Sequence, residues 1–218
     1  MAKRARIFVL AGTNGAGKSS IVGATIRASA AEYFNPDEAA AAIRGASPGM
    51  TGAEANSQAW LEGKRLLERK RLLERAIAEQ LDFAFETTLG GNTITHLLEQ
   101  ALDAGMEVRI WCVGLSSPEL HIARVRARVA KGGHDIPEGD IRKRYDRGRL
   151  NLIQLLPRLT ELRVYDNSDE ADPSSGVAPA PKLVLHLDGG RIMNAGALAS
   201  TPDWAKPIVA AAMKLAGS

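Results

Sequence analysis

Short apolar runs alternate along the chain with longer segments in which apolar residues recur at helical spacing. The first run, Arg6–Ala11, is almost continuously apolar and ends at a glycine, which predicts a buried central strand. A helix is predicted over 18–29 and a weak second strand over 32–35. Strands that alternate with helices predict an α/β fold, a mostly parallel sheet with helices on both faces.

The alternation continues to the end of the chain. Further strands are predicted over 83–85, 107–113 and 162–165, and further helices over 51–80, 92–104, 118–131, 137–156 and 203–216. Segments 183–187 and 191–193 flank Asp188-Gly189-Gly190, and such a pair of turn residues predicts a small C-terminal hairpin. No segment has the composition of a strong linker, so we expect a single domain over residues 1–218.

The glycine-rich turn after the first strand fits the phosphate-binding pattern G-x-x-x-x-G-K-[ST] in full, between a strand and a helix as its chemistry requires. The candidate nucleotide-binding residues are therefore Gly12, Thr13, Asn14, Gly15, Ala16, Gly17, Lys18, Ser19 and Ser20. Lys18 would reach the β- and γ-phosphates, and the Ser19 hydroxyl would ligate Mg²⁺. The alternative is a glycine turn that only links a strand to a helix.

Other features narrow the class of nucleotide-binding protein. No Asn-Lys-x-Asp stretch is present to bind guanine, and no later strand of four apolar residues ends in Asp, as in motor ATPases. A small P-loop phosphotransferase, of the P-loop kinase type with a three-layer sandwich fold, is the class that these exclusions leave.

Acidic and hydroxyl residues follow two of the predicted strands. Because ligands collect at the carboxyl ends of strands in an α/β sheet, we expect Asp37 and Glu86 to face the phosphate loop. Asp37 is the candidate catalytic base, although Asn-Pro-Asp-Glu is also a helix-start sequence. Glu86 closes an apolar strand and needs a partner such as Mg²⁺-bound water or substrate. Thr87 and Thr88 either bind substrate or continue the strand.

Basic residues crowd the two helices predicted after the fourth strand, a lid-like segment at about 118–156. Arg128 and Arg144 are the candidates for clamping the phosphates, with Arg124 and Arg142 next. The alternatives are a solvated charged surface and a contact with RNA or DNA. Nucleic-acid sites interleave aromatic residues with Lys and Arg, and this segment has almost no aromatic residue besides Tyr145. Nucleic acid is therefore not expected as a partner.

The composition of the chain bears on the cellular location of the protein more than on the reaction that it catalyses. The chain has 218 residues and a formal net charge of +3, a mild value for a nucleic-acid binder. Its one cysteine, Cys112, excludes an internal disulfide, and no apolar run is long enough to span a membrane. We therefore expect a cytoplasmic protein with no membrane contact. The four histidines lack metal-ligand spacing, so no zinc site is expected.

Several motifs occur together in an order that resembles the zeta-toxin-type kinases, over about residues 7–168. Besides the phosphate loop they are Asn35-Pro36-Asp37, Phe85-Glu86-Thr87-Thr88, Arg124-Val125-Arg126-Ala127-Arg128 and Gly132-Gly133-His134. The resemblance implies a P-loop kinase fold, ATP with Mg²⁺ as cofactors, and transfer of the γ-phosphate to the 3′-hydroxyl of UDP-N-acetylglucosamine, which makes the protein toxic. It also implies an antitoxin partner that blocks the site.

Single residues match the motifs of that family. Asp37 matches the catalytic aspartate, and Glu86 and Thr88 match the acidic-x-Thr substrate motif. Lys18 and Ser19 match the lysine and hydroxyl residue of the family's phosphate loop. The family also has a substrate-binding glutamate on the helix before the third strand, where this chain has Lys70. A kinase of another nucleotide, dinucleotide or sugar, and a nucleotide-dependent regulatory ATPase, are the alternative functions.

Overall fold

The computed structural model describes residues 4–18, 33–34, 55–169 and 180–217. In chain order its elements are β1 (Arg6–Ala11), β2 (Tyr33–Phe34), α4 (Ala55–Glu79), β3 (Phe83–Thr87), α5 (Asn92–Asp103), β4 (Glu107–Gly114), α6 (Pro118–Val129), α7 (Glu138–Leu155), η1 (Leu156–Arg158), β5 (Glu161–Asp166), β6 (Lys182–Asp188), β7 (Arg191–Ala195), η2 (Leu198–Ser200) and α8 (Lys206–Ala216).

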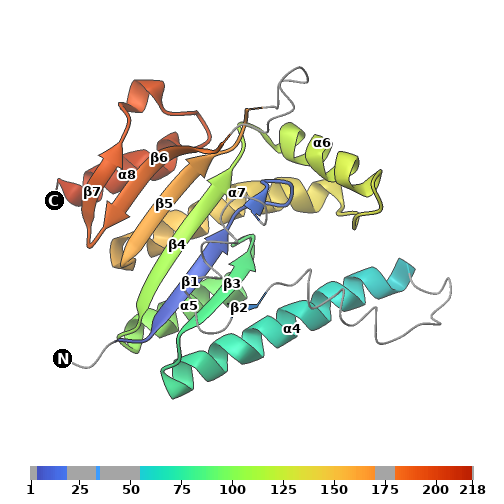
Figure 1. Ribbon diagram of the computed structural model, residues 1–218, viewed down its shortest axis with the longest axis horizontal. Coiled ribbons are helices and arrows are strands. Elements are labelled where there is room, and N and C mark those ends of the chain that lie inside the picture. Colours follow the sequence, from blue (N-terminus) through green and yellow to red (C-terminus); the bar gives the residue numbers. More distant parts are fainter. Residues whose placement is uncertain (1–3, 19–32, 35–54, 170–179, 218) are drawn as a thin grey trace.

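The described strands form one sheet in the order β2-β3-β1-β4-β5-β6-β7 (Figure 1). The pairs from β2 to β5 are parallel, and β6 and β7 are added as antiparallel strands at one edge. Gly189 and Gly190, with φ of 54° and 76°, make the left-handed turn between these last two strands. The predicted mostly parallel sheet and C-terminal hairpin are confirmed.

The third strand is longer than the sequence predicted. It continues through Glu86 and Thr87 because these residues pair with Leu10 and Ala11 of β1. Thr87 therefore continues the strand, which was one of its two expected roles. Glu86 is a strand residue, not a residue that follows the strand.

The main core lies between the sheet and the helices α5, α7 and α8, which cover one face of it (Figure 1). Alternate residues of the central strands, such as Ile7 and Val9, point into this core, and Leu152 and Leu155 of α7 belong to it. Phe8 and Leu10 point to the opposite face. Residues 19–29 of the helix predicted over 18–29 lie outside the described residues. No helix in the described part of the chain is both long and apolar enough to span a membrane.

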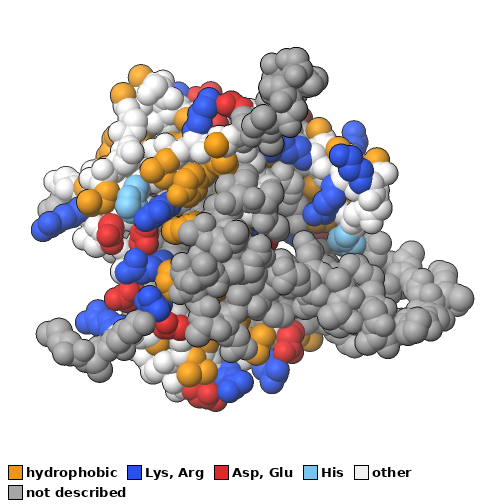
Figure 2. All heavy atoms as spheres, viewed as in Figure 1, with side chains coloured by type: hydrophobic (Ala, Val, Ile, Leu, Met, Phe, Trp, Pro, Cys, Tyr) orange, Lys and Arg blue, Asp and Glu red, His pale blue; other side chains and the backbone are white. Residues whose placement is uncertain are grey.

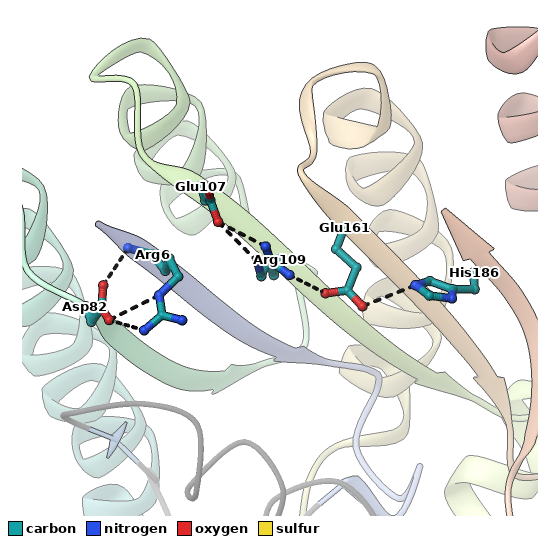
Figure 3. A network of polar contacts seen from close by, with 6 residues as sticks. All are labelled: Arg6, Asp82, Glu107, Arg109, Glu161 and His186. Carbon is teal, nitrogen blue, oxygen red and sulfur yellow. Dashed lines mark hydrogen bonds and ion pairs between the residues drawn. The ribbon is translucent and has the colours of Figure 1, made fainter. Parts of the chain in front are cut away.

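Charged side chains join the strands at the end of the sheet where the parallel strands begin. Figure 3 shows two groups, Arg6 with Asp82 and the row Glu107, Arg109, Glu161 and His186. Glu161 is 5% exposed, and its Oε2 accepts a hydrogen bond of 2.9 Å from Arg109 Nη1. A buried carboxylate needs such partners. This network lies away from the phosphate loop and belongs to the scaffold.

Candidate active site

The phosphate loop runs from the carboxyl end of β1 across the neighbouring strands. Gly12 has φ of 146°, and a Cβ there would lie 2.2 Å from the carbonyl oxygen of Val113 in β4. Gly15 has φ of 85°, and a Cβ there would lie 2.7 Å from the carbonyl oxygen of His121 in α6. Both positions therefore require glycine on grounds of conformation and of space. The Gly12 N–H donates to the carbonyl of Thr87, which joins the loop to β3.

Lys18 lies folded over its own loop. Its Nζ donates to the carbonyl oxygens of Gly12 at 2.6 Å and Thr13 at 3.5 Å. The ammonium group is therefore at the loop, where the sequence predicted a phosphate ligand. Ser19 and Ser20, the other predicted ligands, lie outside the described residues, as does the proposed base Asp37.

His121, in the first turns of α6, is buried beside the tip of the loop. Its Nδ1 lies 2.9 Å from the Asn14 carbonyl oxygen, and its ring meets the Tyr145 ring edge-on at 5.6 Å. The pKa of His121 is lowered from 6.5 to about 4, chiefly by burial and also by the positive charges of Lys18 and Arg124, although the hydrogen bond to the Asn14 carbonyl opposes this shift. The imidazole is therefore neutral near pH 7. Because a carbonyl oxygen only accepts hydrogen bonds, Nδ1 carries the proton and donates.

This depressed pKa predicts a loss of stability in acid. The unfolded chain takes up a proton at His121 near pH 6.5 and the folded chain only near pH 4, so stability falls as the pH drops through this window. Once the pH is below this window, His121 has lowered the unfolding free energy by roughly 3 kcal/mol relative to its value at pH 7. In urea unfolding from pH 7 to 4, His121→Leu should flatten this fall, and the exposed-site control His96→Leu should not. An unchanged pH profile in His121→Leu would contradict the assignment.

The two predicted clamp arginines differ in their surroundings. Arg144 of α7 reaches the tip of the phosphate loop, where its Nη1 donates to Asn14 Oδ1 at 3.0 Å. Arg128 is exposed at the end of α6, and its Nη2 donates to the His134 carbonyl at 2.8 Å. The structure thus brings Arg144 to the loop and places Arg128 on the connection between the two helices.

The next two candidates, Arg124 and Arg142, are engaged at the surface. Figure 2 shows Lys and Arg side chains gathered over α6. Arg142 pairs with Glu119 at 2.5 Å, and Arg124 donates to the Asp169 carbonyl at 3.1 Å. Arg142 thus belongs to a surface ion pair, whereas Arg124 ties α6 to the chain that follows β5.

The end of β3 and the turn over 88–90, which we call the acceptor turn, carry the residues predicted to bind the acceptor. Glu86 and Thr87 are 5% and 6% exposed, respectively. The hydroxyl of Thr87 accepts a hydrogen bond from the Leu89 N–H at 3.2 Å, and that of Thr88 accepts one from the Gly90 N–H at 3.3 Å. Both threonines therefore shape the turn.

Helix α7 holds this turn in place. Asn151 Nδ2 donates to the Leu89 carbonyl at 2.7 Å, and Leu89 has the left-handed φ of 53° that a non-glycine residue adopts only when it is held. A Cβ on Gly148 would lie 2.7 Å from the Thr88 carbonyl oxygen. One helix thus contacts both the acceptor turn and, through Arg144, the phosphate loop.

A small cavity of about 20 Å³ lies between the phosphate loop, the acceptor turn and α7. It has room for one water molecule and not for a substrate. Cys112 lines it, and burial raises the pKa of this thiol to about 12, so the thiol stays protonated. Cys112 is thus a residue of the main core. Among the described residues, no cluster of His, Cys, Asp and Glu could hold a metal ion by itself.

Sequence reasoning missed most of the residues that support the loop from outside. Asn167, directly after β5, donates from Nδ2 to the Ala16 carbonyl at 2.9 Å. Trp204, which precedes α8, packs on Gly114 and donates from Nε1 to Asp166 Oδ1 at 2.8 Å. Their position in the sequence could have identified two of these residues, because Asn167 and His121 both follow the carboxyl ends of strands, where ligand sites form in α/β sheets. Trp204 carried no such signal.

The long helix α4 places its acidic residues in surface pairs. Glu74 lies 3.5 Å from Lys70, and Glu68 lies 2.8 Å from Arg71. All four side chains are at least 43% exposed. The described pairs of Glu68 and Glu74 are thus made within α4 itself, consistent with the departure from the family at Lys70.

Comparisons with known proteins agree with this geometry. A model of the zeta toxin family matches residues 2–172. An uncharacterized protein of Haemophilus influenzae is 30% identical over 135 residues, which cover 62% of this chain and 88% of that protein. The structure of AvrRxo1-ORF1:AvrRxo1-ORF2 with sulphate ions has a TM-score of 0.58 at 15% identity, covering 93% of this chain.

A structure of AvrRxo1-ORF1:-ORF2 with ATP is similar at a TM-score of 0.54 and 15% identity, covering 97% of this chain. The present chain spans 65% and 64% of the chains in these two structures. At such identities the solved structures support the fold alone, which is of the P-loop kinase type. The family match covers most of the sequence and includes the phosphate loop, the acceptor turn and the basic helices. The chain therefore belongs to the zeta toxin family.

Proposed function

We propose that the protein is an ATP-dependent kinase that phosphorylates a small-molecule hydroxyl, with the 3′-hydroxyl of UDP-N-acetylglucosamine as the preferred acceptor. The observation that carries the proposal is a phosphate loop folded at the carboxyl edge of the sheet, with Lys18 over it and Arg144 at its tip. Family membership supports a phosphotransferase that acts as a toxin.

The loop fits the phosphates of ATP. Its glycines at positions 12, 15 and 17 have positive φ values, and a glycine-rich loop of this kind can turn its backbone N–H groups toward an anion. The related structure solved with ATP supports this choice of nucleotide. Mg²⁺ would be held by the Ser19 hydroxyl and the phosphates. Glu86, a hard oxygen donor at the same edge of the sheet, fits a magnesium-bound water.

In the proposed reaction the acceptor oxygen forms a bond to the γ-phosphorus. The bond between that phosphorus and the oxygen bridging to the β-phosphate breaks, and ADP leaves. Asp37 takes the proton of the acceptor hydroxyl. Thr88 and Glu86 would position the acceptor, while Lys18, Arg144 and Arg128 would balance the charge on the phosphates.

We expect any closing movement to be confined to the end of α6 and the connection over 130–137. The second half of α7 belongs to the main core through Leu152 and Leu155, and His121 in the first turns of α6 is bound to the phosphate loop. A protein partner that blocks the nucleotide site is part of the proposal, because the AvrRxo1-ORF1 structures are complexes with a second protein. We further propose that the protein acts in the cytoplasm, without membrane or nucleic-acid partners.

The test incubates purified protein with Mg-ATP and UDP-N-acetylglucosamine and analyses the products by mass spectrometry. A sugar nucleotide one phosphate heavier is expected with the wild type and should be missing with Lys18→Ala. Location of the new phosphate on the 3′-oxygen by NMR completes the assignment. ADP formation without this product would remove the acceptor and leave the two alternatives, a kinase of another nucleotide or sugar and a regulatory ATPase.

A further inference from the structure

Two carbonyl groups of the phosphate loop are bound from outside by side chains that lie far away in the sequence. His121 Nδ1 donates to the Asn14 carbonyl at 2.9 Å, and Asn167 Nδ2 donates to the Ala16 carbonyl at 2.9 Å. The two donors come from different elements, α6 and the segment after β5. Neither belongs to the phosphate-binding motif.

These bonds determine where two N–H groups of the loop point. In a planar trans peptide the C=O of one residue and the N–H of the next are antiparallel. A carbonyl of Asn14 that points outward to His121 therefore turns the Gly15 N–H inward. In the same way, the bond from Asn167 to Ala16 turns the Gly17 N–H inward. Both glycines have left-handed φ values, 85° and 82°, which allow these peptide orientations.

We propose that His121 and Asn167 are positioning residues that aim the N–H groups of Gly15 and Gly17 at the β-phosphate of the nucleotide. The inference rests on the proposed nucleotide site and adds two residues to it. Preformed N–H donors bind an anion more tightly because little ordering is left to be done on binding.

Both anchors are themselves held. His121 is 1% exposed, its ring packs against Tyr145, and its backbone carbonyl lies so close to Gly15 that α6 and the loop cannot separate without breaking this contact. Asn167 is 9% exposed, and its N–H donates to the Gly114 carbonyl at 3.0 Å. A donor that is itself held in place also holds the carbonyl group that it binds.

The test compares binding of ADP and AMP, which differ by the β-phosphate, using isothermal titration calorimetry. His121→Leu and Asn167→Leu remove one donor each with little change of volume, and each should weaken ADP binding about fivefold while leaving AMP binding unchanged. His121→Asn keeps an N–H donor at the δ position and should restore ADP binding. His96→Leu, at an exposed histidine of α5, is the matched control.

A second readout follows the two amide groups directly. In ¹⁵N-labelled protein, ADP should move the amide proton signals of Gly15 and Gly17 downfield. His121→Leu should reduce the shift at Gly15 and leave the shift at Gly17, and Asn167→Leu should do the reverse. A purely structural effect would reduce both shifts equally in either variant, which would overturn the inference.

The outcomes separate this inference from the proposed function. If the wild type binds ADP no more tightly than AMP, the phosphate site itself fails, and the proposed kinase fails with it. If the wild type prefers ADP and both leucine variants keep that full preference, the kinase proposal stands and the positioning roles are wrong.

Discussion

Asp37→Asn is expected to lose phosphate transfer by about 10²- to 10⁴-fold, the range that a positioned general base supplies, while binding ATP like the wild type. The amide cannot accept the proton of the acceptor hydroxyl, yet it keeps the size of the carboxylate and one hydrogen-bond acceptor oxygen. Single-turnover transfer and calorimetric ATP binding, measured on the same preparation, test the two halves of this expectation.

The asparagine variant distinguishes the two possible roles of Asp37, catalytic base and helix cap. Asparagine caps a helix about as well as aspartate does, whereas alanine does not. If Asp37 is only a helix cap, Asp37→Asn should be nearly as active and as stable as the wild type, and Asp37→Ala should lose about 1 kcal/mol of unfolding free energy. If Asp37 is the base, both variants should be inactive. Full transfer by Asp37→Asn would therefore remove the catalytic role.

The fold was largely predictable because its signals are local. The apolar run of β1 ends where predicted, at Ala11, and the Gly189-Gly190 turn produces the expected hairpin. The end of β3 was missed by two residues. Glu86 and Thr87 are polar, and only their pairing with β1, a long-range contact, keeps them in the strand. A pattern read along one segment contains no information about the partner strand.

The site was predictable where a motif is contiguous and not where contacts cross the sheet. The phosphate loop is one segment with fixed spacing, so its residues could be named from the sequence. The anchors His121 and Asn167 act over separations of 107 and 151 residues. Arg128 and Arg144 looked alike in the sequence, since both lie on basic helices of similar composition. Only the packing of α7 on the acceptor turn brings Arg144 to Asn14.

This difference in position predicts that Arg144→Ala will lower kcat for phosphate transfer about 10³-fold, the scale of an arginine that stabilises charge in the transition state. The side chain is 23% exposed and already lies at the loop, so no large movement is needed before it can contact a γ-phosphate. Because the interaction strengthens as the phosphoryl group transfers, kcat should fall much more than ATP affinity. Arg144→Lys should recover part of the loss, since it keeps the charge without the planar fork of donors.

Two matched variants show whether this loss is specific. Arg147→Ala removes an exposed arginine one turn further along the same helix and should leave kcat unchanged. Arg128→Ala should cost less than Arg144→Ala, because the Arg128 guanidinium is bound to the His134 carbonyl and must leave it to reach the nucleotide. Steady-state kinetics of the three variants rank them. A larger loss at Arg128 than at Arg144 would mean that α6 and its connection close over the nucleotide and supply the principal arginine, and the assignment of Arg144 to that role would be wrong.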